Sequence, residues 1–440
     1  MLTQLASAAL HGVDGFLVQV EVHVTTGLPS FSVVGLPQGE VREGRERVTA
    51  ALTNARLSLP PRKITVNLAP ADVRKEGSAF DLPIALGLVA AREKGRGGRG
   101  LDPERLRGCA FLGELGLDGT LRPVRGALPV AVVCRREGIR TLVLPEANAK
   151  EAAAVEGVTV LGAPSLAAVL AHFDGGTRLR VTRDFRPPPA GSLARTPDLA
   201  EVRGQEHAKR ALEVAAAGGH NLVLVGPPGV GKTMLARRLP GILPPLSPQE
   251  ALEATTIHSV AGTLPVGSGL LAVRPFRAPH HTVSDAGLVG GGNPPRPGEA
   301  SLAHHGVLFL DELPEFRRNA LEALRQPLED GVVLLARARW SLRYPARFVL
   351  VAAMNPCPCG YWGDGTDRCT CDPIHVMKYR ARISGPLMDR IDLQIEVPSV
   401  EYSTLAGFPT GPSSGEVRMR VTEARDRQRI RFEGVRGVHC

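Results

Sequence analysis

The chain has 440 residues, of which 43% are hydrophobic and 22% are charged, a balance typical of globular proteins with two or three domains. It contains no apolar run of about eighteen residues and no N-terminal secretion signal, so we expect a cytoplasmic protein, not a membrane or secreted one. The formal net charge of +9 favours an anionic partner such as a nucleotide or nucleic acid.

The first 182 residues alternate β-rich runs with helical runs that are rich in alanine and leucine. We expect strands at FLVQVEVHV, KITVNLAP and TLVLP, and helices at FDLPIALGLVAAREKG and LPVAVVCRREG. This alternation predicts an α/β or α+β domain over residues 1–182. Residues 183–199 are rich in proline and arginine and have no periodicity, so we interpret them as a linker.

A second domain begins with a helical run, EHAKRALEVAAAGG, and continues with strand, glycine loop and helix in NLVLVGPPGVGKTMLARRL. The loop matches GxxxxGK[ST], in which backbone N–H groups surround phosphate oxygens, the lysine reaches the β- and γ-phosphates and the final hydroxyl ligates Mg²⁺. The predicted ATP-binding residues are Gly226, Pro227, Pro228, Gly229, Val230, Gly231, Lys232 and Thr233.

Two carboxylates end the next apolar run, GVLFLDE. Asp311 is suited to the Mg²⁺ shell together with Thr233, and Glu312 is suited to polarise the attacking water. The alternative, an acidic pair that only caps the following helix, is less consistent with a phosphate loop earlier in the same domain. Hydrolysis of ATP is therefore the expected reaction.

Two further residues complete the predicted catalytic set. The run RFVLVAAMNP delivers Asn355, whose amide can orient water against the γ-phosphate. ISGPLMDRID offers Arg390, which is a candidate for the arginine that a neighbouring subunit supplies to the developing charge. Without that context, an arginine here would more often pair with Asp389 or Asp392.

Four of the seven cysteines lie close together at Cys357, Cys359, Cys369 and Cys371. Two C-x-C pairs with glycines between them can ligate a metal tetrahedrally, which predicts a structural Zn²⁺. Four thiolates leave no open position on the metal, so a catalytic metal is not expected. The alternative is four reduced thiols without metal.

Five long motifs stand in one order: GPPGVGKT, RPFRAPHHTVSDAGLVGGG, HHGVLFLDELPEF, MNPCPCGY and RISGPLMDRIDLQIEVP. In these motifs the chain resembles the YifB/ComM family of magnesium-chelatase-like AAA+ ATPases. The resemblance implies a P-loop AAA+ core over residues 200–400, a hexameric ring and branch migration of DNA during natural transformation. It also implies that residues 401–440 begin a C-terminal helical lid, which we expect to be truncated, so no lid arginine is assigned.

The N-terminal segments RKEGSAFDLPIALGLVAA and GELGLDGTLRPVRGALPVAVV resemble the proteolytic domain of Lon, which belongs to the ribosomal S5 domain 2-like fold and uses a Ser-Lys dyad. At the two dyad positions this sequence has Ala79 and Leu128, and Ser78 stands one residue before the nucleophile position. A serine without a positioned base remains an ordinary hydroxyl. We therefore expect an inactive Lon-like domain that serves binding or assembly.

The segment between the phosphate loop and Asp311 leaves alternatives open. Its histidine pairs, His280–His281 and His304–His305, are better interpreted as hydrogen-bonding loop residues than as metal ligands. GLVGGG predicts a hairpin directed to the ring pore. Three arginines can meet phosphates or be solvated charges, namely Arg274, Arg277 and Arg296. The arginine-rich helix GEVRMRVTEARDRQRIRF, residues 415–432, is interpreted as a solvated lid helix.

The function therefore has three candidates. The first is an ATP-driven motor on DNA. The second is a chelatase- or chaperone-like protein remodeller, as in magnesium chelatase, although the Lon-like domain argues against a dedicated chelatase subunit. The third is a nucleotide-dependent scaffold that does not hydrolyse ATP.

Overall fold

A computed structural model describes residues 1–433 except 38, 58–60, 76, 92–100, 184–195, 338–339, 366 and 407–410. The chain forms two compact units. Unit 1 contains residues 1–187 and 255–270, and unit 2 contains residues 188–254 and 271–440. Nothing in the sequence pattern had indicated that residues 255–270 belong with the N-terminal unit. Most of the expected linker, 184–195, lies outside the described residues.

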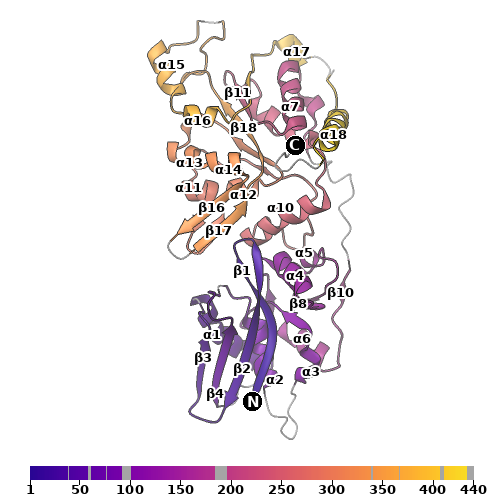
Figure 1. Ribbon diagram of the computed structural model, residues 1–440. Coiled ribbons are helices and arrows are strands. Elements are labelled where there is room, and N and C mark those ends of the chain that lie inside the picture. Colours follow the sequence, from indigo (N-terminus) through magenta and orange to yellow (C-terminus); the bar gives the residue numbers. More distant parts are fainter. Residues whose placement is uncertain are drawn as a thin grey trace. The chain divides into compact units, whose positions relative to one another are not determined.

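Unit 1 is built around an eight-stranded mixed sheet with the order β10-β9-β8-β5-β1-β2-β4-β3. Figure 1 shows β1 and β2 as a long twisted antiparallel pair. The strands are β1 (Leu2–His11), β2 (Asp14–Thr25), β3 (Ser30–Val34), β4 (Lys63–Ala69), β5 (Cys109–Phe111), β8 (Thr141–Pro145), β9 (Thr159–Ala163) and β10 (Val181–Thr182), with a separate pair β6 (Glu114–Leu115) and β7 (Leu121–Arg122).

The helices of unit 1 cover this sheet. They are α1 (Gly39–Asn54), α2 (Asp81–Ala90), α3 (Pro103–Leu106), α4 (Ala127–Arg136), α5 (Ala149–Ala152) and α6 (Leu166–Phe173). Every residue of α2 is buried, which explains why its sequence is apolar on all sides. The strands and helices expected from the alternating pattern of residues 1–182 are confirmed, except that the end of the expected helix FDLPIALGLVAAREKG, residues 92–95, lies outside the described residues.

A buried ion pair fixes the start of α2 against α1. Arg47 donates from Nε and Nη2 to the two carboxylate oxygens of Asp81, at 2.6 and 3.1 Å, and the Leu115 N–H donates to the same carboxylate at 3.2 Å. The Asp81 side chain is only 2% exposed. Burial raises the pKa of Asp81 to about 6, although the bonds from Arg47 act in the opposite direction.

Unit 2 is built on a five-stranded sheet with the order β12-β15-β18-β11-β19, in which all four neighbouring pairs are parallel. Its strands are β11 (Leu222–Val225), β12 (Phe276–Arg277), β15 (Val307–Leu310), β18 (Val349–Met354) and β19 (Leu393–Glu396). β15 and β18 are buried along their whole length, which accounts for their unbroken apolar runs. The predicted α/β class is confirmed for this unit.

Helices and two hairpins surround the sheet of unit 2 (Figure 1). The helices are α7 (Glu206–Gly218), α8 (Lys232–Ala236), α9 (Leu239–Ile242), α10 (Pro248–Ala261, shared between the units), α11 (Asp285–Val289), α12 (Glu299–Leu302), α13 (Arg318–Ala323), α14 (Arg325–Asp330), α15 (Pro373–Arg380), α16 (Gly385–Met388), α17 (Tyr402–Ala406) and α18 (Ser414–Arg431). The hairpins are β13 (Gly290–Gly292) with β14 (Pro295–Pro297), and β16 (Val332–Arg337) with β17 (Trp340–Pro345).

The arginine-rich helix α18 is less solvated than its composition suggested. It packs on α7 and α9 through the buried Val417 and Val421. Arg420 Nε donates to Glu213 at 2.6 Å, and Arg425 Nε donates to the carbonyl oxygen of Ala216 at 2.8 Å. The helix is thus solvated along the face that carries Arg427 and Arg429, as expected, while its other side packs on α7 and α9.

Within the described part of the chain, no helix combines the length and the hydropathy that a bilayer crossing requires.

We expect Arg47→Met to destabilise unit 1 by about 3 kcal/mol at pH 8, because it leaves the Asp81 carboxylate buried without its cation. A raised folded-state pKa means that the stability of the variant is lost as pH rises through that pKa, so the loss at pH 5 should be smaller. Urea titration with hydrogen exchange on α2 peptides measures both. Arg107→Met, which removes an exposed pair with Glu104, is the control, and an equal loss in both variants would contradict the interpretation.

Candidate functional site

The predicted site residues of unit 2 follow the carboxyl ends of three neighbouring strands. β11 and β15 both pair with β18 in parallel, so their carboxyl ends meet at the same edge of the sheet. Gly226 comes directly after β11, Asp311 after β15 and Asn355 after β18. The sheet thus brings together three segments that are far apart in the sequence.

The loop between β11 and α8 has the backbone that its glycines predict. Gly229 and Gly231 have φ angles of +80° and +94°, a region that residues with a side chain rarely adopt. A Cβ added to Gly226 would lie 2.2 Å from the carbonyl oxygen of Val397, so only glycine fits between the loop and the end of β19. The loop ends where α8 starts at Lys232.

The Lys232 ammonium group is held at the loop. Nζ donates to the carbonyl oxygens of Gly226 at 2.6 Å and Pro227 at 2.8 Å, and to Oδ1 of Asn355 at 3.1 Å. Burial lowers the pKa of Lys232, and the nearby Asp311 acts in the opposite direction. The structure therefore joins the lysine of the phosphate loop directly to the predicted amide on β18.

Thr233 and Asp311 meet in the same way. The Thr233 hydroxyl donates to Oδ2 of Asp311 at 2.7 Å, and Oδ1 of Asp311 accepts from the N–H of Glu312 at 3.0 Å. A hydroxyl and a carboxylate oxygen side by side form a donor set that suits Mg²⁺, which prefers oxygen ligands. These two residues, beside a loop of backbone N–H groups, fit a magnesium-bound nucleotide.

Glu312 lies at the rim of this group. Its φ angle is +53°, and its side chain is 57% exposed. Its carboxylate Oε2 lies 3.0 Å from Nδ1 of His281, a contact that no sequence pattern had indicated. Glu312 and Asn355 also line a pocket of about 700 Å³, to which α15 contributes His375, Lys378 and Tyr379.

α15 supports the backbone around Asn355. The N–H of Asn355 donates to the Tyr379 hydroxyl, and Arg380 Nε donates to the carbonyl oxygen of Pro356 at 3.1 Å. Burial raises the pKa of Tyr379 to about 12, so its hydroxyl stays protonated and neutral. Neither residue was predicted to be functional, because neither belongs to a recognised motif.

The four cysteines of the loop between β18 and α15 converge, as predicted. Sγ of Cys357 lies 3.3 Å from that of Cys359 and 3.9 Å from that of Cys369, and all four sulfur atoms lie within 4.8 Å of one another. Zn–S bonds of about 2.3 Å in a tetrahedron place sulfur atoms about 3.8 Å apart, so the arrangement fits Zn²⁺. Backbone N–H groups of Gly360 and Trp362 donate to the Cys357 sulfur at 3.2 and 3.3 Å.

The cysteine loop touches the phosphate loop. Gly360 has a φ angle of +92°, and a Cβ built on it would lie 2.7 Å from Cδ of Pro228 and 3.9 Å from Cγ of Asn355. The loop therefore packs against two of the predicted ATP-site residues.

Arg390 is not brought to the other predicted residues within one chain. Its Nε and Nη2 donate to Oε1 of Glu329 on α14, at 2.9 and 2.6 Å. The described residues show no contact between Arg390 and the phosphate loop. The partner is neither of the aspartates, Asp389 and Asp392, that its local sequence offered.

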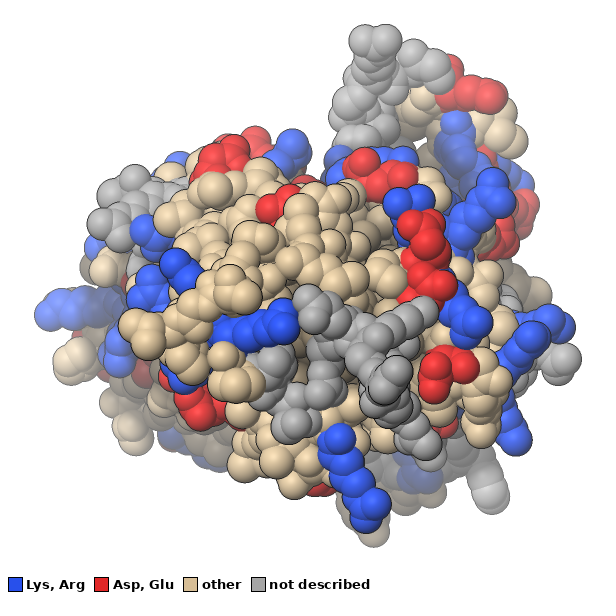
Figure 2. Space-filling view, turned by 90° about the horizontal axis from the view of Figure 1, so that it is seen from below, with Lys and Arg blue, Asp and Glu red and all other residues tan. Residues whose placement is uncertain are grey.

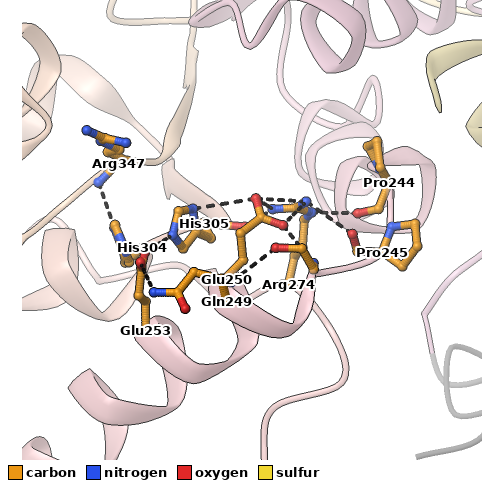
Figure 3. A network of polar contacts seen from close by, with 10 residues as sticks. Pro244, Pro245, Gln249, Glu250, Glu253, Arg274, His304, His305 and Arg347 are labelled. Atoms are coloured by element: carbon orange, nitrogen blue, oxygen red, sulfur yellow. Dashed lines mark hydrogen bonds and ion pairs between the residues drawn. The ribbon is translucent and has the colours of Figure 1, made fainter. Parts of the chain in front are cut away.

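The second histidine pair, His304 and His305, belongs to a polar network at the N-terminal end of β15 (Figure 3). Arg274, only 8% exposed, donates to Glu250 and to the carbonyl oxygens of Pro244 and His305. His305 Nε2 lies 2.7 Å from Oε2 of Glu253. Arg274 is therefore a structural residue. Arg277 likewise pairs with Glu299, so neither is a solvated charge.

Glu253, His304 and His305 lie close enough to share a metal, but the hydrogen bonding of His304 opposes this. Its Nδ1 accepts from the backbone N–H of Arg347 at 2.9 Å, so the proton of the neutral ring is on Nε2. A ligating histidine normally donates from its other nitrogen, which cannot happen here. Burial lowers the pKa of His304 to about 3 and keeps the ring neutral.

In unit 1, the two positions at which the resemblance to Lon predicted a dyad carry neither a hydroxyl nor an amine. Ala79 and Leu128 stand at these positions, and Leu128 is fully buried in α4. The neighbouring Ser78 hydroxyl donates to the carboxylate of Glu114, and no amine is recorded beside it.

Comparisons with known proteins identify the family to which the chain is similar. Family models for magnesium chelatase, subunit ChlI, and for subunit ChlI of Mg-chelatase match residues 198–405 and 20–148. Competence protein ComM of Haemophilus influenzae is 45% identical over 425 residues, which cover 96% of this chain and 82% of that protein. The uncharacterized protein YifB of Escherichia coli is 46% identical over 430 residues, with 97% and 82% covered. The magnesium-chelatase 38 kDa subunit of Rhodobacter capsulatus is 28% identical over 193 residues, with 39% and 54% covered.

We expect Gly226→Ala to lower the stability of unit 2 by about 1–3 kcal/mol, because its Cβ meets a backbone oxygen that cannot move without displacing β19. Thermal unfolding followed by tryptophan fluorescence reports on this unit, since Trp340 and Trp362 both belong to it. Gly385→Ala, where a Cβ meets nothing within 4 Å, is the control. Equal melting temperatures for Gly226→Ala and the unmodified protein would show that the loop can adapt.

Proposed function

We propose that this chain, which belongs to the YifB/ComM family of magnesium-chelatase-like proteins, is an ATP-hydrolysing motor that acts on DNA. The magnesium-chelatase family that its models match is AAA+ ATPase-like. The observation that carries hydrolysis is the convergence at the sheet edge, where Thr233 contacts Asp311 and Lys232 contacts Asn355.

Each residue of this group has a role in the proposal. Lys232 turns from its carbonyl partners toward the β- and γ-phosphates of ATP, while Thr233 and Asp311 hold Mg²⁺. When bound, Mg²⁺ neutralises charge on the phosphate oxygens. Glu312 accepts a proton from the attacking water, and the Asn355 amide orients that water.

The proposal further requires a homo-oligomeric ring, which we expect to be a hexamer. Arg390 then serves the ATP of the neighbouring protomer, where its charge stabilises the transferred phosphoryl group. To do so it leaves Glu329, and this exchange is inexpensive because both side chains are about 40% exposed. α17 and α18 are proposed to belong to the helical lid.

DNA is the proposed substrate because a relative that is 45% identical over nearly the whole chain is named a competence protein and because the net charge is +9. The hairpin of β13 and β14 is the proposed contact with DNA. Its glycine backbone and the exposed Arg296 can contact the phosphates of a DNA strand whatever the base sequence. Basic and acidic side chains are interspersed on the face shown in Figure 2, so that face favours no broad anion-binding surface. Branch migration during natural transformation or recombination is the specific activity proposed.

A second candidate, the remodelling of a protein partner, is favoured by the similarity to the magnesium-chelatase 38 kDa subunit. That similarity covers only 39% of this chain, and DNA is therefore our first choice. For unit 1 we propose a Lon-like fold without protease activity, because the two dyad positions hold alanine and leucine.

For the cysteine loop we propose a structural Zn²⁺ bound by Cys357, Cys359, Cys369 and Cys371. The metal holds the loop closed, and the loop in turn supports Pro228 and Asn355. The proposed role is therefore mechanical, since four thiolates leave no position for water or substrate.

Replacing Glu312 tests the motor proposal. We expect Glu312→Gln to lower kcat for ATP by roughly 100-fold with little change in nucleotide affinity, because an amide cannot accept the proton of water. We also expect branched or single-stranded DNA to stimulate the unmodified protein. The exposed Glu104→Gln is the control. An ATPase rate that DNA leaves unchanged, together with no DNA retention, would reject the motor on DNA and favour the remodeller.

Elemental analysis tests the zinc proposal. We expect about one zinc per chain in the purified protein and near-complete loss of it in Cys369→Ser. The KM for ATP should rise in that variant, because the loosened loop no longer supports the phosphate loop. Cys109→Ser, which removes a thiol of unit 1, should keep the metal. Protein purified without chelators that contains no zinc would exclude the site.

A further inference from the structure

The helix α15 carries apolar side chains on two faces. One face is buried in unit 2 through Val376 and Tyr379, which are 5% and 7% exposed. Ile374 and Met377 are 58% and 66% exposed, and they stand three positions apart, so they share one outer face of the helix. A surface helix normally has a single apolar face, and a second one that is open to solvent indicates a contact with another molecule.

The cysteine loop before α15 adds to this apolar surface. Trp362 of the loop is 37% exposed, although a large aromatic side chain is usually better covered. We refer to Trp362, Ile374 and Met377 as the outer surface of α15 and its loop.

α15 also borders the approach to the candidate ATP site. His375, Lys378 and Tyr379 line the same pocket of about 700 Å³ as Glu312 and Asn355. A side chain of another molecule that reaches Glu312 and Asn355 through this pocket therefore passes along α15.

One chain leaves this site without an arginine for the γ-phosphate. Arg390 is held by Glu329, and no contact between Arg390 and the phosphate loop exists in the part of the chain that the structure describes. In the proposed function this arginine comes from a neighbouring protomer, whose Arg390 segment must then lie at the pocket.

We infer that the outer surface of α15 and its loop is where the Arg390 segment of a second copy of this chain docks. The inference deepens the proposed function and rests on it, since it assumes that Arg390 acts on the ATP of a neighbour. It adds the surface that brings the arginine there. Each copy uses two different surfaces, so the contact is heterologous and can close into a ring.

The charges of the two surfaces are complementary. The end of α15 and the residues after it expose Lys378, Arg380 and Arg382, although Arg382 also pairs with Glu315 at 2.9 Å. The exposed carboxylates near Arg390 are those of Glu329, Asp330, Asp389 and Asp392. A basic surface that meets an acidic one favours this contact over the pairing of two α15 surfaces.

The cysteine cluster fixes the start of the docking surface. Cys371 is followed directly by Asp372, whose side chain caps α15 by accepting hydrogen bonds from the N–H groups of Ile374 and His375 at 2.7 and 3.0 Å. A metal held by the four cysteines therefore orders the first turn of α15, which carries Ile374. We thus expect assembly of the protein to depend on the cysteines as well as on the apolar residues.

Sedimentation velocity of Met377→Asp with Mg²⁺ and a non-hydrolysable ATP analogue tests the docking. We expect the protein concentration for half-maximal assembly to rise roughly tenfold or more, because a carboxylate replaces an apolar side chain in the contact. The ATPase rate at a fixed protein concentration should fall with it. Met419→Asp is the matched control, since Met419 is 68% exposed on α18 of the same unit and should leave assembly unchanged. Cys369→Ser should weaken assembly as Met377→Asp does.

A mixture of two variants tests which surfaces meet. Met377→Asp keeps its Arg390 segment, and Asp389→Arg keeps its α15. Each should assemble weakly alone, whereas together the α15 of Asp389→Arg can receive the Arg390 segment of Met377→Asp. The mixture should therefore hydrolyse ATP faster than the sum of the two variants measured separately, and a rate no higher than that sum would overturn the inference.

Two further outcomes separate this inference from the proposed function. If Arg390→Ala hydrolyses ATP normally, the proposed role of Arg390 fails and the inference fails with it. If Arg390→Ala is slow but Met377→Asp assembles and hydrolyses ATP as the unmodified protein does, only the inference fails. Normal assembly of Met377→Asp with a loss of DNA retention would assign the surface to DNA and reject a second copy as its partner.

Discussion

The parallel pairing of β18 with both β11 and β15 is the constraint on which the site depends. The three strands end at the same edge, where β15 is followed by Asp311, β18 by Asn355 and β11 by the phosphate loop. The contacts of Lys232 with Asn355 and of Thr233 with Asp311 exist because that register is kept. A one-residue slip would turn each side chain to the other face of the sheet.

Behind this edge, a second layer of contacts fixes the backbone that carries Asn355. Tyr379 and Arg380 on α15 hold the peptide groups at residues 355 and 356, and the cysteine loop lies between α15 and Pro228. The four cysteines are thus placed where closing one loop orders two parts of the site. A cysteine cluster far from the phosphate loop could not have this effect. The position of the cluster in the fold is therefore more important for the site than the strength with which it binds a metal.

Much of the site could be predicted from the sequence, because it consists of short motifs next to apolar strands. The turn glycines Gly229 and Gly231 and the carboxylate Asp311 need only their neighbours in the chain to be interpreted. The contact of His281 with Glu312 joins residues that are far apart in sequence, and it depends on how β12 and β15 lie side by side. The pair of Arg390 with Glu329 could not be predicted for the same reason, since local sequence offered two nearer aspartates.

The two histidine pairs illustrate why a residue pattern alone did not separate their roles. In both pairs the two rings are close and tilted against each other, with centroids 4.1 and 3.8 Å apart and interplanar angles of 36° and 47°. His304 is buried, accepts a hydrogen bond from a backbone N–H and is neutral, so its role is to pack at the N-terminal end of β15. His281 is 30% exposed and faces an exposed carboxylate at the other end of the same strand. A buried neutral ring cannot change partners without cost, whereas a half-exposed one can.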